Sequence, residues 1–419
     1  MDRTPLENTV YKLLHAVVVG KAYSQIALDK EFRAGAYDSN ARSYITKLFY
    51  GVLDKSIQFD WIIGKAVQTP PQENVSIILK TGLYLLRHMR TPSYAAVDKT
   101  VELCKTVTQN SKIAGFVNAV LKKTASVSLP PVTDAESLAI NASYPLWLAK
   151  KLIDRFGFDF TREYLLFVPS PLTHIRHNGI RLTREEFEQK YPQITQNKGE
   201  YGYYAAHNTI RSLKNSDYVV QSAASVRAVR AYFEPSAKKV LDLCAAPGGK
   251  AVYLYELYKT AGLPVKITAC DVHPHRVGLI KKYAYSAGAN LTVMQSDAGV
   301  FRPEWERAFD SVVCDAPCSG LGVVSKKPEI LLTLAPADIA SLTALQSVIL
   351  STAARYVKPG GSLCYSTCTV TEEENEGITD GFLRANPGFE YAGKPVTLFP
   401  HTDGCDGFYI AKLKRVRGD

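Results

Sequence analysis

The sequence predicts an α/β protein in which an all-α domain and a small α+β subdomain precede a parallel β-sheet with helical crossovers. Three observations support this fold class. Residues 1 to about 130 carry apolar side chains at helical spacing with little strand signal. From Val240 onward short apolar runs alternate with helical segments, which is typical of βαβ units. Several of these runs end in an acid, a thiol or a Gly-rich turn, and ligands of parallel sheets bind beyond the carboxyl ends of the strands.

Length and composition indicate a folded protein of several domains. With 419 residues the chain exceeds one ordinary core, so two or three domains are expected. A hydrophobic content of 46% with 21% charged residues is typical of a soluble protein, and no uninterrupted apolar stretch suggests a membrane span. The first residues lack a signal sequence and the eight cysteines are scattered, which favours reduced thiols and a cytoplasmic location.

The formal net charge of the chain is 50 − 40 = +10. A basic surface suits a polyanion such as nucleic acid, whose phosphates would make binding dependent on salt. A solvated basic surface without any such partner explains the charge equally well.

Residues 1–135 are expected to form the helical domain. Apolar residues recur at helical spacing in four stretches: residues 40–53, 75–86, 95–103 and 115–123. Asp38 and Ser39 are N-cap candidates for the first helix, because their side chains can accept hydrogen bonds from the free N–H groups of its first turn.

A Pro-containing segment, residues 126–134, is predicted to separate the helical domain from the rest of the chain. Residues 136–225 are expected to contain a linker helix near 145–152 and a small α+β subdomain, because strand and helix patterns mix there. Residues 226–419 form the predicted α/β domain.

A Gly-rich turn comes after the first predicted strand of that domain, residues 240–243. A strand, a Gly-rich turn and a helix N-terminus together allow close approach of a nucleotide-like ligand. The turn has neither the P-loop spacing nor G-x-G-x-x-G, which disfavours a phosphate cradle and a dinucleotide site. The residues of the turn are Cys244, Ala245, Ala246, Pro247, Gly248, Gly249 and Lys250.

Acids end the next three predicted strands: Asp271 after residues 267–270, Asp297 after 291–296, and Asp315 after 309–314. One such Asp is often only the cap of the following helix. Three in succession behind a Gly-rich turn instead favour a ligand, and a carboxylate at Asp271 could accept both hydroxyls of a ribose.

Two thiols stand at predicted strand ends, Cys318 after Asp-Ala-Pro and Cys368 in Ser-Thr-Cys. A thiolate is a strong nucleophile near neutral pH, so this placement suggests chemistry. A zinc site that adds Cys314 and Cys364 is the alternative. It is disfavoured because these two cysteines fall inside predicted buried strands, where a thiol packs as a small hydrophobe.

These strings resemble the NOL/NOP/Sun family of RNA cytosine-C5 methyltransferases, which carries Asp-Ala-Pro-Cys, Ser-Thr-Cys and this Gly-Gly-Lys loop. The resemblance implies a Rossmann-like core that binds S-adenosylmethionine through residues 244–250, Asp271, Asp297 and Asp315, with Asp297 near the adenine. It also implies roles in the reaction. Cys368 attacks the cytosine, Asp315 contacts ring nitrogen 3, and Cys318 assists release. In DNA cytosine-C5 enzymes the nucleophile is instead the cysteine that follows a Pro, as Cys318 does here.

The helical stretches resemble the NusB-type domain of the bacterial Sun branch, through residues 50–53, 94–97 and 116–121. This implies RNA as the partner, with small-subunit ribosomal RNA favoured. A tRNA methyltransferase and a non-catalytic RNA-binding assembly factor are the alternatives, and a monomer without metal is expected. The resemblance also suggests that Arg176 and Asn178 contact RNA, although both could be plain surface residues. Ser222 stands where the family usually has Asp.

Overall fold

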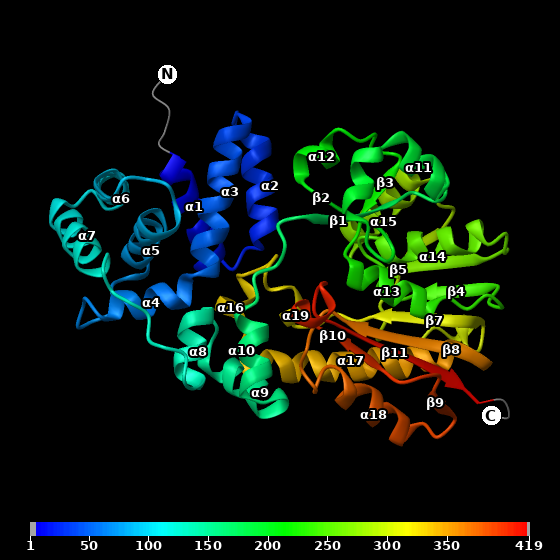
Figure 1. Ribbon diagram of the computed structural model, residues 1–419. Helices are drawn as coiled ribbons and strands as arrows, with labels where there is room; N and C mark the ends of the chain where they lie inside the picture. The colour runs from blue at the N-terminus through cyan, green and yellow to red at the C-terminus, as the bar shows by residue number, and fades with distance from the viewer. Residues whose placement is uncertain (1–5, 417–419) are drawn as a thin grey trace. The chain divides into compact units, whose positions relative to one another are not determined.

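A computed structural model describes residues 6–416, and the chain folds into two compact units (Figure 1). The helical unit comprises the described residues through Phe167 together with Val324–Leu334. The α/β unit comprises Val168–Val323 and the described residues from Ala335 onward.

The helical unit forms as its apolar periodicity predicts. Asp38 caps α3, since its carboxylate accepts a hydrogen bond from Ala41 N at 2.8 Å. Ile45, Leu48 and Phe49 then lie on one buried face of α3. The helices are α1 Leu6–Val18, α2 Ser24–Ala34, α3 Ser39–Asp54, α4 Ser56–Gly64, α5 Glu73–His88, α6 Ser93–Thr108, α7 Ser111–Thr124, α8 Ala135–Ala142, α9 Leu146–Phe156, α10 Phe158–Leu166 and α16 Ile330–Thr333.

The segment Val324–Leu334 belongs to the helical unit although it comes after the Asp-Ala-Pro-Cys motif in the chain. Its Glu329 is buried and accepts hydrogen bonds from Ser24 N at 3.1 Å and Ser24 Oγ at 2.8 Å. Leu332 packs against the apolar cluster of α1, α3 and α5. A carboxylate and a leucine therefore fix this segment to the N-terminal helices.

The α/β unit begins with a small antiparallel sheet of order β2-β1-β3, as expected for an α+β subdomain. Its core gathers Ile175, Phe187, Ile194 and Tyr203. The elements are β1 Thr173–His177, α11 Arg184–Lys190, η1 Pro192–Asn197, β2 Tyr203–Ala205, α12 His207–Arg211, β3 Tyr218–Val220 and α13 Ala223–Tyr232.

The main sheet has the order β10-β11-β8-β7-β4-β5-β6, and β9 pairs with β11. Strands β4 to β8 pair in parallel, whereas β9, β10 and β11 are antiparallel additions. The elements are β4 Lys239–Asp242, α14 Gly249–Thr260, β5 Lys266–Asp271, α15 Pro274–Ala287, β6 Thr292–Gln295, η2 Pro303–Trp305, β7 Phe309–Asp315, η3 Leu321–Val323, α17 Pro336–Tyr356, β8 Val357–Thr367, α18 Glu376–Ala385, β9 Phe389–Tyr391, β10 Val396–Leu398, α19 Pro400–Asp403 and β11 Phe408–Arg415.

Helices cover both faces of this sheet, with α17 and α18 on one side and α13, α14 and α15 on the other (Figure 1). By length and composition α17 is the one described helix that could cross a membrane. Its Ile349, Leu350 and Ala353 are buried in the core that the sheet shares with α18.

Candidate active site

The residues of interest gather at the carboxyl ends of β4, β7 and β8. The chain runs from β4 outward to β5 and β6, and then returns to the other side of β4 as β7. Loops leaving β4 and β7 therefore diverge at a point where the strand order reverses, and a crevice forms at such a switch point. The Gly-rich turn and the Asp-Ala-Pro-Cys loop are those two loops.

The Gly-rich turn after β4 is held from both sides. Ala245 N donates to Cys270 O at 2.8 Å, which ties the turn to β5. Gly248 has φ 113, a left-handed value that favours glycine, and a Cβ there would lie 3.3 Å from Ile280 Cα. Burial, and then the charge of Asp242, raises the pKa of Cys244, so this thiol suits packing in the turn better than nucleophilic attack.

Asp271 ends β5 and Asp297 follows β6, as predicted. The two acids differ in exposure. Asp271 is 5% exposed; its Oδ1 accepts from His273 N at 3.0 Å, while its Oδ2 has Arg276 Nη1 at 3.8 Å. Asp297 is exposed and accepts from Gly299 N at 2.8 Å. The Oδ2 atom of the buried Asp271 has only the long contact with Arg276, so it can accept hydrogen bonds from ribose hydroxyls. The Gly-rich turn beside Asp271 allows a nucleoside to approach. The residues present thus fit S-adenosylmethionine.

Asp315 is the polar centre of the site. Its Oδ2 accepts from Lys250 Nζ at 2.5 Å and its Oδ1 from Ser366 Oγ at 2.7 Å. Burial alone would lower the pKa of Lys250, but the charge and hydrogen bond of Asp315 outweigh it and raise that pKa. Lys250, expected at the cofactor, thus also holds the carboxylate at the end of β7. Ser366 is a contact that the sequence did not single out.

The two thiols meet although 50 residues separate them in the chain. Cys318 Sγ lies 3.2 Å from Cys368 Sγ and accepts from Cys368 N at 3.3 Å. The hydrogen bond with Cys368, followed by burial, raises the pKa of the Cys318 thiol. Both causes favour the protonated form of the Cys318 thiol. Cys314 and Cys364 are fully buried in β7 and β8.

A buried carboxylate joins the loops that carry the two thiols. Glu374 is 0% exposed and accepts from Ser319 N at 2.8 Å, Ser319 Oγ at 2.6 Å and Thr371 Oγ1 at 2.7 Å. Gln346 Nε2 of α17 donates to it at 3.1 Å. Glu374 belongs to the string Glu-Glu-Asn-Glu at residues 373–376. The sequence alone does not show its role, because all but one of these partners come from distant parts of the chain.

Asp242 is a second titratable group that the sequence did not single out. It ends β4 and is 2% exposed. Burial, and then repulsion by Asp315, raises its pKa to about 7, although Lys250 acts in the opposite direction. The protonation of this carboxyl therefore changes near neutral pH inside the site.

Arg176 and Asn178, for which RNA contact or a place on the open surface was expected, are both buried. Each is 1% exposed. Asn178 Nδ2 donates to Ser216 O and Ala287 O, both at 3.0 Å, so it joins the subdomain to α15.

Ser222 caps α13 by accepting from Ser225 N at 3.2 Å. Since Asp and Ser are comparable N-caps, this contact accounts for the Ser where the family has Asp.

Among residues 6–416 no group of three or more His, Cys, Asp or Glu side chains is placed to hold a metal ion.

Comparison with known proteins agrees with both units. Residues 232–414 match the family described as 16S rRNA methyltransferase RsmB/F, and residues 8–126 match the NusB family. The probable ribosomal RNA small subunit methyltransferase B of Bacillus subtilis is 30% identical, over 99% of this chain and 100% of that protein. The ribosomal RNA small subunit methyltransferase B of Xanthomonas campestris is 28% identical, over 90% of each.

Solved structures share the fold. The crystal structure of PH0851 superposes with a TM-score of 0.80 at 24% identity, covering 98% of this chain and 99% of that one. NSun6 from Pyrococcus horikoshii, solved with SFG, has a TM-score of 0.56 at 19% identity and covers 66% of this chain and 99% of that one.

Proposed function

The chain belongs to the family of ribosomal RNA small subunit methyltransferase B, and from this premise we propose that it methylates carbon 5 of a cytosine in 16S ribosomal RNA. S-adenosylmethionine is the cofactor that the family implies. The observation that carries the cytosine-5 assignment is the contact between Cys318 and Cys368 beside Asp315. Methyl transfer to an oxygen or an exocyclic nitrogen has no need of two thiols.

Carbon 5 of cytosine is a weak nucleophile until a group adds to carbon 6. Cys368, as the thiolate, forms that bond, and the ring becomes an enamine. Asp315, held by Lys250 and Ser366, is the proposed contact of ring nitrogen 3, and the ammonium of Lys250 beside it supplies positive charge toward the negative charge that develops on the ring. A bound cofactor would supply an electrophilic methyl group on a sulfonium for carbon 5 and would leave as the neutral thioether.

Release requires that carbon 5 lose its proton so that the bond from Cys368 to carbon 6 can break. When Cys368 becomes a thioether it loses its charge, which removes a cause of the raised pKa of Cys318. Cys318 can then ionise and take the carbon-5 proton, and Cys368 leaves as thiolate. The two thiols thus act in sequence.

Ribosomal RNA is the proposed substrate because the curated relatives carry it in their names and match this chain almost throughout. The NusB-like residues 8–126 and the net charge of +10 support binding to RNA. We assign RNA binding to residues 1–135, a linker and RNA-facing subdomain to 136–225, and methyl transfer to 226–419. The protein would act as a monomer in the cytoplasm.

Bisulfite sequencing of 16S rRNA from a strain lacking the gene tests the proposal. One cytosine that resists conversion in the parent should convert in the deletion strain. Resistance should return with the intact gene and not with a Cys368→Ala copy. If all 16S cytosines respond identically and a tRNA cytosine changes instead, the substrate assignment is wrong. If no RNA changes, the cytosine-5 assignment is wrong.

A further inference from the structure

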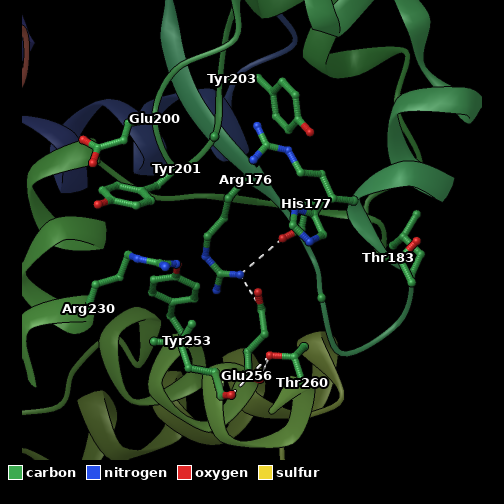
Figure 2. A pocket seen from close by; sticks show the side chains of 15 residues that line it. Arg176, His177, Thr183, Glu200, Tyr201, Tyr203, Arg230, Tyr253, Glu256 and Thr260 are labelled. Atoms are coloured by element: carbon green, nitrogen blue, oxygen red, sulfur yellow. Dashed lines mark hydrogen bonds and ion pairs between the residues drawn. The ribbon is translucent and has the colours of Figure 1, made fainter. Parts of the chain in front are cut away.

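A cavity of about 580 Å³ lies in the α/β unit between the small antiparallel sheet and α14 (Figure 2). We propose that it binds a nucleotide of the RNA substrate other than the target cytosine. This inference rests on the proposed function, since it assumes an RNA substrate. The thiols, Asp315 and the Gly-rich turn do not line the cavity, so it is separate from the site described above.

The walls of the cavity combine tyrosines with arginines. The guanidinium of Arg230 lies 4.4 Å from the ring centre of Tyr201, and that of Arg176 lies 4.1 Å from the ring centre of Tyr253. Arg230 Nη1 also donates to Tyr253 Oη at 3.2 Å. Figure 2 shows Arg230 and Tyr201 on one side of the cavity, with His177 and Thr183 on the other.

The two arginines differ in what they can offer a ligand. Arg176 is buried and forms an ion pair with Glu256, while its Nε donates to Gln221 Oε1 at 2.8 Å. Its Nη2 has no hydrogen-bond partner among the described residues. Arg230 is exposed and pairs with no carboxylate in the described part of the chain. Arg230 thus keeps a positive charge at the cavity wall that no carboxylate neutralises, and Arg176 supports Tyr253 from behind.

This combination matches a nucleotide of a single-stranded RNA segment. Bases stack on aromatic rings and on guanidinium planes, and arginine binds phosphate oxygens in a bidentate manner. Burial, and then the charge of Arg176, lowers the pKa of His177 to about 4. The imidazole is therefore neutral at physiological pH and can accept a hydrogen bond from a base edge.

One helix connects the cavity to the active site. Lys250, which binds Asp315, is in the first turn of α14, whereas Tyr253, Glu256 and Thr260 of the same helix line the cavity. At 1.5 Å per residue these positions lie roughly 5–15 Å along the helix from Lys250. A nucleotide held there would fix the RNA chain near the target cytosine.

Steady-state methylation of transcribed 16S rRNA by the full-length protein tests the proposal. Tyr201→Ala and Arg230→Ala should each raise KM for RNA about tenfold with kcat within about twofold, since each removes a contact to bound RNA. Arg230→Ala should also reduce the slope of log affinity against log salt by about 1. Tyr201→Phe keeps the ring and should behave as wild type. Affinity for S-adenosylmethionine should not change.

Arg355→Ala is the matched control, because Arg355 is also an exposed arginine stacked on an aromatic ring, that of Phe301 at 3.2 Å, but lies outside the cavity. An unchanged KM and salt slope in the folded Tyr201→Ala and Arg230→Ala variants would overturn the proposal, as would an equal effect of Arg355→Ala. If the wild-type protein methylates no cytosine in any RNA, the proposed function itself fails, which is a different result.

Discussion

At the scale of single residues, the proposed cofactor contact with the most direct consequence is Asp271. Its Oδ1 already accepts from His273 N, so Asp271→Asn keeps that contact and removes the charge available to ribose hydroxyls. We expect affinity for S-adenosylmethionine to fall tenfold to hundredfold, because charged hydrogen bonds contribute about 1.5–3 kcal/mol. Calorimetric titration measures this. An unchanged affinity in a folded variant would remove Asp271 from the cofactor site.

Asp242 should make stability depend on pH. In the folded protein the pKa of Asp242 is about 7, which exceeds the ordinary Asp value. The contribution of this carboxyl to stability is therefore complete below its pKa in the unfolded chain, and it is lost as pH rises through 7. Asp242→Asn removes this loss. The free energy of unfolding of the variant relative to wild type should therefore rise by about 2–3 kcal/mol between pH 5 and pH 8.

Urea unfolding of the cofactor-free protein at these two pH values tests this expectation for Asp242. A difference between wild type and Asp242→Asn that stays constant with pH would mean that the carboxyl ionises normally in the folded protein.

At the scale of elements, Glu374 fixes the loop after β7 against the loop after β8. Glu374→Ala would leave Ser319 N and Gln346 Nε2 buried with one acceptor fewer, at about 1–3 kcal/mol each. The thiols would lose their mutual position, so kcat should fall at least tenfold while KM for S-adenosylmethionine changes little. Glu374→Gln should recover most of kcat, because the hydroxyls of Ser319 and Thr371 can turn to accept from its amide.

Methylation kinetics of the two Glu374 variants would distinguish positioning from simple loss of stability. Equal kcat in wild type and a folded Glu374→Ala variant would show that the other contacts suffice to hold the loops.

The elements differ in how far the sequence could predict them. The strand ends that carry Asp271, Asp315 and Cys368 were predictable, because buried strands are short apolar runs and ligand residues follow them directly. The burial of Arg176 was not, because it depends on Glu256, which is 80 residues away in the chain. The docking of Val324–Leu334 on the helical unit likewise depends on Ser24, and local periodicity carries no sign of it.

At the scale of the whole molecule, the net charge of +10 should govern binding to RNA. Each phosphate neutralised by Lys or Arg releases counterions, so affinity should fall steeply between 50 mM and 200 mM salt. Filter binding of transcribed 16S rRNA at several salt concentrations measures the slope. An affinity independent of salt would mean that the basic surface does not bind the RNA.

Removal of the N-terminal helices is expected to do more than weaken RNA binding. Deletion of residues 1–130 takes away Ser24 and the apolar cluster that hold Glu329 and Leu332. Point substitutions at exposed lysines are therefore cleaner probes of the helical unit than truncation.

The central claim is that Cys368 bonds to the cytosine and Cys318 allows its release. The direct measurement is a denaturing gel of each cysteine variant after incubation with transcribed 16S rRNA and S-adenosylmethionine. Cys318→Ala should accumulate a slow-migrating RNA–protein adduct with the methyl group already transferred, because addition needs only the nucleophile. Cys368→Ala should form neither adduct nor product. An adduct from Cys368→Ala and none from Cys318→Ala would reverse the roles, and full activity without adduct in both would contradict the covalent mechanism.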